Sequence, residues 1–373
     1  MAGLYIHIPF CKKACHYCNF HFSTSLKNKK VMIECIALEL EQRSGELSEK
    51  VDTIYFGGGT PSLLNPNDFY YLFTKIENHY DLNKELEISI EANPDDLNEK
   101  NLSSLKDCGF NRLSIGIQSF SNEILFQMNR AHSSQQALSA VYNAQKVGFS
   151  NISIDLMFGL PDLNESMWKE TLHKAIDLNV QHISCYNLTV EESTALWHFV
   201  NTDKIHLPPI LNQESQFFAA HDILCDNGFD HYEISNYSKP NFKSQHNSSY
   251  WNRTAYIGIG PSAHSFLGRV RSWNISNNVK YMDSVNSLSP TSSQETLSVK
   301  DQFNEMVMLA LRTSKGIKKA DLNNYSLSIQ KEFNEKIASL KSNGIIKENN
   351  SHLRLTDKSY YLCDLYSSEL FAE

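Results

Sequence analysis

The chain has 373 residues, of which 41% are hydrophobic and 20% charged, so it is long enough for two or three domains with a proper core. Its formal net charge of −8 excludes an overall basic surface of the kind that binds nucleic acid. The first residues lack the features of a signal peptide, and no run reaches the ~20 apolar residues of a membrane span. We therefore expect a cytoplasmic protein whose eight cysteines need not form disulfides.

Six short β-rich runs occur in the first half of the chain, at residues 4–8, 52–56, 86–91, 112–118, 151–156 and 182–188. Between them apolar residues recur at helical spacing, as at 31–42 and 135–148. This alternation predicts parallel βα units, six in number instead of the eight of a closed barrel. The expected fold is α/β, with an open partial (β/α)6 barrel whose chemistry lies at the carboxyl ends of the strands.

Three cysteines cluster directly after the first β-rich run. Cys11, Cys15 and Cys18 lie in the stretch FCKKACHYCNF, and Phe20 stands where a fourth cysteine could be. In a reducing compartment such a cluster indicates metal or redox chemistry. Three thiolates on an iron–sulfur cube would leave one iron with an open position for a ligand. The alternative is a small zinc site completed by a histidine, with His7, His16 and His21 as candidates.

Polar residues and glycines stand where the next β-rich runs end. The glycine-rich stretch 57–61 (GGGTP) follows the second run, and Glu91, Gln118 and Asp155 close the third, fourth and fifth. Glycines let a ligand approach the backbone, and carboxylates accept hydrogen bonds from hydroxyl or ammonium groups. Because all of them are expected on one face of the barrel, the sequence predicts a shared ligand site there.

Five stretches together resemble the radical S-adenosylmethionine superfamily: YIHIPFCKKACHYC, FGGGTPS, SIEANPD, RLSIGIQSF and DLMFGLP. The resemblance covers nearly the whole chain and narrows to the branch of oxygen-independent coproporphyrinogen III oxidases and HemW heme chaperones. It implies a [4Fe-4S] cluster on Cys11, Cys15 and Cys18, with the open iron binding S-adenosylmethionine. It also implies that eight residues surround that cofactor, namely Tyr5, Gly58, Gly59, Thr60, Glu91, Gln118, Arg130 and Asp155.

Three features favour the chaperones within this branch. Phe20 replaces a further cysteine of the oxidases, and the N-terminal extension of the oxidases is not seen before the first β-rich run. The stretch HNSSYW at 246–251 matches a signature, HNxxYW, associated with heme binding. The resemblance therefore implies heme binding by four residues, His246 as the iron ligand with Asn247, Tyr250 and Trp251, and His264 is the rival ligand. Read without the resemblance, the stretch is a loop ahead of a strand, with Tyr250 and Trp251 in the core.

The function implied is a heme chaperone that binds heme and delivers it to heme-requiring acceptors, including membrane-associated respiratory proteins. Its place would be the cytoplasm, peripheral at the membrane during transfer, and a homodimer is allowed. The alternative is a coproporphyrinogen III oxidase that decarboxylates propionate side chains. The oxidase is an enzyme, whereas a chaperone need not catalyse a reaction. No catalytic residue is assigned.

The chain is expected to divide into four parts. Residues 1–230 form the radical S-adenosylmethionine core, 231–283 a sheet extension, 284–299 a Ser/Thr-rich linker, and 300–373 an α+β winged-helix-like domain. Winged-helix units often bind nucleic acid, but residues 301–373 hold 10 Lys+Arg and 10 Asp+Glu, a net charge of zero. No nucleic acid partner is therefore expected.

Overall fold

The computed structural model describes residues 2–373. Its central part is six parallel strands that lie side by side in chain order. They are β1 (Ala2–Ile8), β2 (Val51–Gly58), β3 (Leu82–Ala92), β4 (Arg112–Gln118), β5 (Ile152–Phe158) and β6 (His182–Asn187). All six coincide with the predicted runs, so the open (β/α)6 arrangement is confirmed.

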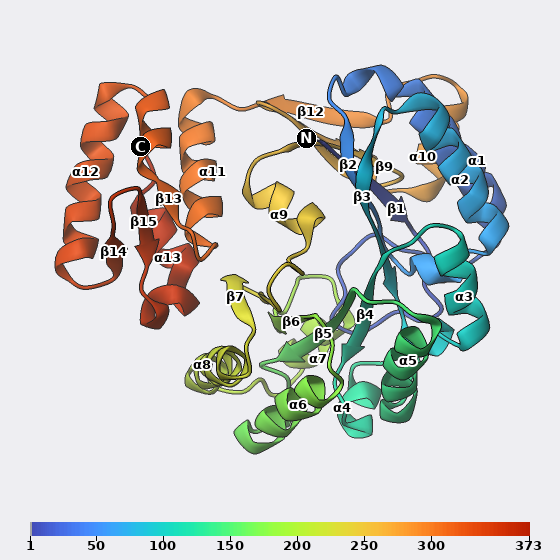
Figure 1. The fold of residues 1–373 in the computed structure, drawn as a ribbon, viewed down its shortest axis with the longest axis horizontal. Helices are drawn as coiled ribbons and strands as arrows, with labels where there is room; N and C mark the ends of the chain where they lie inside the picture. Colours follow the sequence, from blue (N-terminus) through green and yellow to red (C-terminus); the bar gives the residue numbers. More distant parts are fainter. Residues whose placement is uncertain (1) are drawn as a thin grey trace.

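Helices follow the strands and cover the outer face of the curved sheet (Figure 1). They are α1 (Lys29–Gln42), α2 (Pro66–His79), α3 (Glu99–Asp107), α4 (Asn122–Gln127), α5 (Ser134–Val147) and α6 (Glu165–Asp177). Each main helix buries one apolar side. On α2, for example, the rings of Phe69 and Phe73 pack against Phe56 of β2 with centroids 5.6 and 5.4 Å away. This packing holds the strands in register and fixes their carboxyl ends.

The sheet continues past the barrel at both edges and has twelve strands in all. Beyond β6 lie β8 (Asn236–Ser238) and β7 (Asp230–Glu233), after the helices α7 (Ala195–Asn201) and α8 (Ile210–Asp226). Beyond β1 lie β9 (Ala255–Ile259), β10 (His264–Leu267), β11 (Val270–Asn274) and β12 (Ser292–Thr296), with β9 parallel to β1. The short helix α9 (Gln245–Trp251) connects the two edges and packs against β1 and β2.

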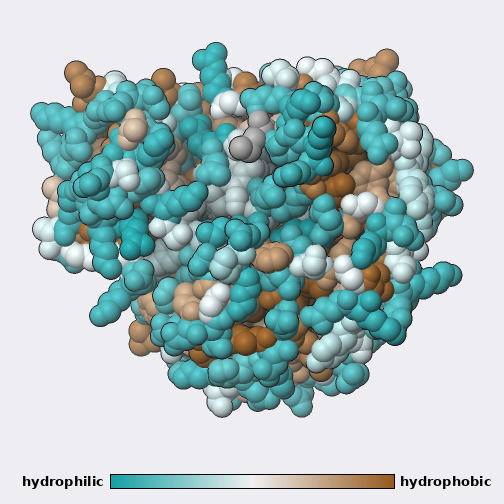
Figure 2. Space-filling model, in the orientation of Figure 1, coloured by the Kyte–Doolittle hydropathy of each residue, from teal (hydrophilic) through white to brown (hydrophobic). Residues whose placement is uncertain are grey.

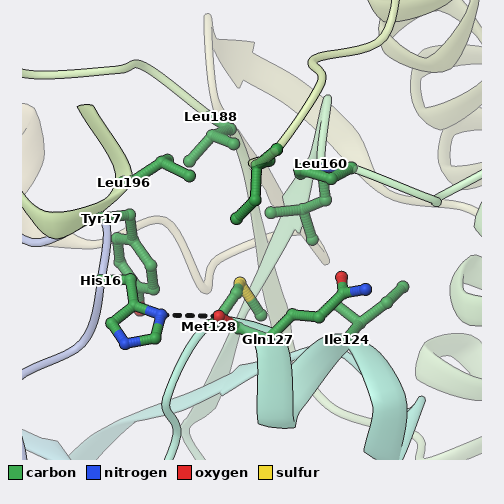
Figure 3. Close-up of a pocket in the computed structure, with 10 residues that line it drawn as sticks. His16, Tyr17, Ile124, Gln127, Met128, Leu160, Leu188 and Leu196 are labelled. Carbon is green, nitrogen blue, oxygen red and sulfur yellow. Dashed lines mark hydrogen bonds between the residues drawn. The ribbon is translucent and has the colours of Figure 1, made fainter. Parts of the chain in front are cut away.

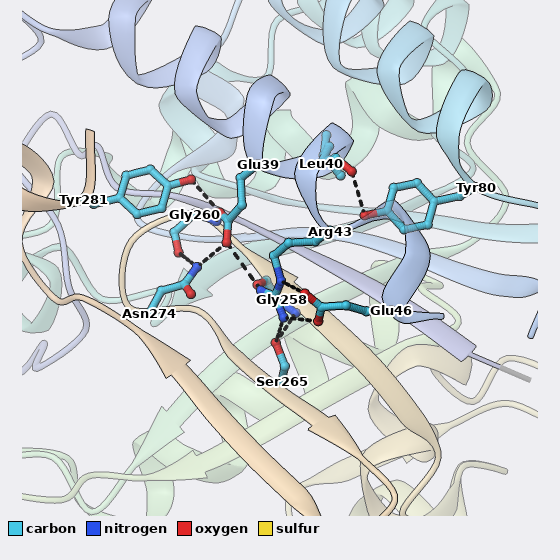
Figure 4. Close-up of polar contacts among 10 residues, drawn as sticks. All are labelled: Glu39, Leu40, Arg43, Glu46, Tyr80, Gly258, Gly260, Ser265, Asn274 and Tyr281. Carbon is cyan, nitrogen blue, oxygen red and sulfur yellow. Dashed lines mark hydrogen bonds and ion pairs between the residues drawn. The ribbon is translucent and has the colours of Figure 1, made fainter. Parts of the chain in front are cut away.

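A buried carboxylate ties the extension to the barrel. Glu39 of α1 is 1% exposed, and its oxygens accept hydrogen bonds from Tyr281 (2.5 Å), Asn274 (2.8 Å) and the backbone nitrogen of Gly260 (2.8 Å). Arg43 of the same helix donates to Glu39 at 3.3 Å and to the carbonyl oxygen of Gly258 at 2.8 Å (Figure 4). The network therefore joins α1, β9, β11 and α10 (Asn278–Asn286).

The predicted linker at 284–299 is wrong. The end of α10, strand β12 and the first residue of α11 (Val299–Leu311) occupy it, and β12 pairs antiparallel with β11. All five residues of β12 are exposed. A strand that is exposed to solvent on both faces has a polar composition, as a linker does. The composition of residues 284–299 therefore could not distinguish the strand from a linker.

Residues from α11 onward form a small separate unit, the C-terminal unit (Figure 1). It contains β13 (Ile317–Lys318), α12 (Leu327–Ser342), the hairpin β14 (Ile346–Glu348) and β15 (His352–Leu355), and α13 (Cys363–Glu369). Its sheet order is β13-β15-β14, and the succession of helix, strand, helix and hairpin is winged-helix-like, as predicted. The unit is joined to the barrel edge by two backbone hydrogen bonds, Ile234 to Arg312 (2.9 Å) and Ser314 to Tyr232 (3.0 Å).

The face of the molecule seen in Figure 2 is mainly hydrophilic. Hydrophobic side chains show in the hollows between helices, over the region of β5, β6 and α7. Among the described residues no helix has both the length and the apolar character needed to cross a membrane.

Candidate functional site

A cavity of about 420 Å³, here called the thiol cavity, opens at the carboxyl ends of the barrel strands. Cys11, Cys15 and Cys18 all line it. So do seven of the eight residues expected around S-adenosylmethionine: Gly58, Gly59, Thr60, Glu91, Gln118, Arg130 and Asp155. The eighth, Tyr5, is not among the lining residues and belongs to a second cavity described below. The structure thus brings together the motifs that the sequence placed on one face, and it places Tyr5 in the neighbouring cavity.

The glycine-rich stretch after β2 holds the cysteine loop in place. The nitrogen of Gly59 donates to the carbonyl oxygen of Ile8 at 2.9 Å, and the nitrogen of Thr60 donates to that of Phe10 at 2.7 Å. A Cβ atom at Gly59 would lie 2.6 Å from the oxygen of Phe10, so no other residue permits this approach. The Thr60 hydroxyl, in turn, donates to Cys11 Sγ at 3.4 Å. The glycine-rich stretch therefore fixes the position of Cys11 through the backbone of its loop and through Thr60.

Arg130 lies inside the cavity wall, not on the helix surface where its sequence context would allow it. Its Nη1 donates to Cys15 Sγ at 3.3 Å, and its Nη2 donates to Asn93 Oδ1 and to the oxygen of Gly116, both at 2.7 Å. Its Nε is buried with no partner among the described residues. The guanidinium thus offers a hydrogen bond and a positive charge to a sulfur that would bind iron as a thiolate.

Two carboxyl groups face the same cavity. Glu91 accepts from Tyr55 Oη at 2.8 Å and from the nitrogen of Gly58 at 3.2 Å, and Asp155 accepts from Ser114 Oγ at 3.3 Å. Burial raises the pKa of Glu91 to about 7 and that of Asp155 to about 6. Asp155 does not close its strand as predicted, because β5 continues to Phe158, but its side chain still points into the cavity. Such acids suit a cationic ligand.

Gln118 is held in an uncommon backbone conformation at the end of β4. Its φ of 65° lies in the left-handed region that side chains other than glycine rarely adopt. Strain of this kind persists where the surrounding structure fixes it, and it is typical of binding sites.

Sequence reasoning missed the end of the sixth strand. Tyr186 and Asn187 close β6 and line the thiol cavity, together with Asn93 after β3. The rule that found Glu91 and Gln118, polar residues at strand ends, applies equally to these positions and could have found them.

No histidine completes a zinc site. His16 Nδ1 hydrogen-bonds to the backbone oxygen of Gln127 at 2.8 Å, beside an apolar hollow formed by residues such as Met128 and Leu196 (Figure 3). The nitrogens of His7 contact Tyr5 Oη and the oxygen of His21, and none of the three candidate histidines lines the thiol cavity. Within residues 2–373 no three His, Cys, Asp or Glu side chains converge as ligands of a single metal ion.

The donor set fits a [4Fe-4S] cluster instead. In a cube each thiolate binds a different iron, so the three sulfurs surround a volume and need not converge on a point. The thiol cavity supplies three thiols, two hydrogen-bond donors to their sulfurs, and an unpartnered buried nitrogen of Arg130.

His246, the predicted heme ligand, is buried inside the barrel. Its ring is 1% exposed, stacked at 4.9 Å on Tyr55 inside the barrel. Nδ1 is 2.7 Å from Thr53 Oγ1 and Nε2 is 2.8 Å from Tyr250 Oη, so both nitrogens are engaged. The carboxylate of Glu87 accepts from the nitrogen of His246 at 3.0 Å and holds the start of α9. As a heme ligand His246 would have to give up one of these two ring contacts, because α9 packs against β1 and β2 and encloses its ring.

The other residues of the signature diverge. Tyr250, not Asn247, holds the imidazole of His246, and Asn247 donates through its backbone nitrogen to Ser244 Oγ at 3.2 Å. Trp251 faces a cavity between α9 and the C-terminal unit, with its indole nitrogen buried and without a partner among the described residues. Residues 246–251 form a helix, whereas the sequence pattern alone predicted a loop there.

The fold and the site define the class of protein. Residues 5–175 match the family model of the radical SAM superfamily, and residues 297–362 match that of the HemN C-terminal domain. In overall structure the chain is similar to coproporphyrinogen III oxidase (HemN) from Escherichia coli, with a TM-score of 0.86 over 100% of this chain and 90% of that one. Because the two are 22% identical, this likeness shows the shared fold alone.

Full-length relatives define the family more narrowly. The chain is 33% identical over 362 residues to the heme chaperone HemW of Lactococcus lactis subsp. lactis (strain IL1403), covering 96% of this chain and 94% of that relative. It is 32% identical over 370 residues to the heme chaperone HemW of Bacillus subtilis (strain 168), covering 97% of each. The chain belongs to the HemW family of radical SAM proteins.

Proposed function

We propose that this protein is a heme chaperone: it binds heme as cargo and hands it to acceptor proteins that need it. The observation that carries the proposal is the thiol cavity, where three thiols line one wall and Phe20 stands at the rim in place of a fourth. The full-length relatives, named as heme chaperones, support the same role.

In this proposal Cys11, Cys15 and Cys18 hold a [4Fe-4S] cluster. When bound, the cluster and S-adenosylmethionine would supply one-electron chemistry at the carboxyl face of the barrel. Thr60 and Arg130 donate to two of the sulfurs and thereby stabilise the thiolates. Charge and hydrogen bonds near such sulfurs set the reduction potential of a cluster, so these two residues tune as well as hold it.

The carboxyl side of the cavity would bind S-adenosylmethionine. Glu91 and Asp155 line the same cavity as the thiols and can accept from its ammonium and hydroxyl groups. Gly58 and Gly59 let the backbone pack closely beneath the cysteine loop, since a Cβ at either position would lie 2.6 Å from His7 or Phe10. The proposal assigns these residues to binding and orientation.

Phe20 separates this proposal from an oxidase. Its side chain is 69% exposed at the edge of the thiol cavity and offers no ligand, acid or base to a porphyrinogen. An exposed aromatic ring of this size instead favours contact with a flat apolar partner.

Anaerobic reconstitution followed by iron counting and heme titration tests the proposal. We expect about four irons per chain, as one cube requires, and saturable heme binding at one site. Replacing Cys11, Cys15 or Cys18 with alanine should abolish the cluster absorbance, whereas Cys35→Ala, in buried α1, should not. If the protein is stable with zinc bound and no iron, it does not hold an iron–sulfur cluster. If the wild type shows no saturable heme binding, it is not a heme chaperone.

A further inference from the structure

A second cavity of about 410 Å³ lies beside the thiol cavity, along β1 and β9. We call it the histidine cavity, because His7, His21 and His264 line it together with Tyr250 and Tyr256. Its volume falls within the ~300–1,000 Å³ of small-molecule sites. Asn19 and Phe20 line both cavities, so the exposed ring of Phe20 stands at their common rim.

The three histidines of this cavity differ in what their ring nitrogens are free to do. Both nitrogens of His7 are engaged, with Tyr5 Oη at 3.2 Å and with the oxygen of His21 at 2.8 Å. His21 Nε2 is 2.7 Å from Asn278 Oδ1, which leaves Nδ1. The ring of His264 is exposed and has no hydrogen bond to any residue of the described chain. Among the three, His264 is therefore the imidazole with both ring nitrogens available to a metal, whereas His21 offers Nδ1 alone.

The surroundings of His264 keep its ring in the form that ligates iron. It stacks near Trp273 of the paired strand β11, with centroids 6.2 Å apart and planes 29° apart. Burial and the nearby Arg271 guanidinium lower the pKa of His264 below its usual value, so the ring is neutral near pH 7. Neutral imidazole is the ligating species.

The HNSSYW stretch (residues 246–251) contributes Tyr250, but not His246, to the lining of the histidine cavity. Tyr250 of α9 lines it, and the hydroxyl of Tyr250 is held by the buried ring of His246 at 2.8 Å. Tyr250 also packs edge-on against Tyr256 at 4.6 Å. His246 is thus a positioning residue that supports an aromatic wall, in a place where it cannot itself contact a ligand.

We propose that heme binds in the histidine cavity, with the imidazole of His264 as its iron ligand and with Phe20 and Tyr250 against the macrocycle. The inference rests on the proposed function for the identity of the ligand, and it specifies the site. Heme is a flat, largely apolar disc around an iron, and aromatic walls with one free imidazole match both features. Bound there, heme would lie next to the thiol cavity across Phe20.

The test is a heme titration of the reconstituted full chain, read at the Soret band against the heme-free protein, with resonance Raman detection of an iron–imidazole stretch. His264→Ala should lose that stretch and weaken heme binding by about tenfold or more, as loss of a metal ligand does. His264→Gly should regain the stretch when free imidazole is added. Phe20→Ala should weaken binding while the stretch and the iron count of the cluster stay unchanged. His173→Ala, an exposed histidine of α6, is the matched control and should bind as the wild type does.

His246→Gln separates the two possible ligands. A glutamine at this position can still hydrogen-bond to Thr53 and Tyr250, so heme binding and the iron–imidazole stretch should survive. If His264→Ala keeps the stretch and His246→Gln loses it, the site proposed here is wrong although the protein still binds heme. If the wild type binds no heme, both this site and the proposed function fail.

Discussion

Glu91 and Asp155 are half-buried acids that line the thiol cavity, and their burial sets how they respond to pH. Because burial disfavours the charged form, the pKa of Glu91 is raised to about 7 and that of Asp155 to about 6. Below these values each carboxyl is neutral in the empty site. A cationic ligand binds the carboxylate, so at low pH a proton must leave before the contact forms.

The affinity for S-adenosylmethionine should therefore fall as the pH is lowered through about 7, approaching about tenfold per pH unit for each proton released. Isothermal titration at several pH values, in buffers of different ionisation enthalpy, would measure the affinity and the protons released. Glu91→Gln should bind more weakly at pH 8 and lose most of the pH dependence. An affinity that is flat from about pH 6 to pH 8 in the wild type would show that these acids do not contact the ligand.

At this scale the sequence predicted which residues line the thiol cavity, but it did not predict the contacts that enclose His246. Cys11 and Glu91 follow their strands in sequence, so a rule about strand ends places them. The surroundings of His246 depend on Thr53, 193 residues away, and no local pattern shows that pairing. The place of Tyr5 in the histidine cavity was not predictable for a similar reason, because the neighbouring strands decide which cavity each residue of a strand meets.

Helix α1 and the added strands depend on one another through Glu39. Its carboxylate joins α1 to α10 and β11, and burial raises its pKa, so the group is costly to bury unless its partners remain. Arg43 keeps a second carboxylate partner in Glu46, at 2.8 Å. The network therefore loses part of its stabilisation, but not all, when Glu39 is removed.

Glu39→Ala should lower the free energy of unfolding by about 3 kcal/mol, the lower end for a broken buried pair. Chemical denaturation followed by circular dichroism would measure this loss. Glu34→Ala, an exposed residue of the same helix, is the control and should leave the denaturation midpoint unchanged. Equal midpoints for the two variants would mean that the strands beyond β1 do not depend on this network.

At the level of elements, what could be predicted followed from periodicity. The six parallel strands alternate with helices of clear apolar spacing, and the structure reproduces them. Strand β12 is exposed throughout and short, so nothing in its composition separates it from a linker. The order of the strands after β6 could not be predicted from the sequence either. Strands β7 and β8 join one edge of the sheet and β9 to β12 join the other, although the two groups are close in sequence.

The molecule as a whole places two cavities side by side at one end of an open barrel. The thiol cavity holds the residues of the radical SAM superfamily, and the histidine cavity adjoins it across Asn19 and Phe20. The C-terminal unit contacts both edges of the sheet, through backbone hydrogen bonds beside β7 and through Glu305 paired with Arg271 of β11. It contributes no residue to the lining of either cavity. This arrangement suits a carrier whose cargo lies beside a redox centre.

The central claim is that a porphyrin is carried and not converted. The most direct measurement incubates one anaerobically reconstituted preparation, with reductant and S-adenosylmethionine, in parallel with heme and with coproporphyrinogen III. The account predicts that heme is retained at about one per chain, as a single axial histidine site allows, and passes to an added heme-free acceptor. It also predicts no protoporphyrinogen IX. Multiple turnovers of coproporphyrinogen III to that product, or heme that washes off without saturating, would contradict it.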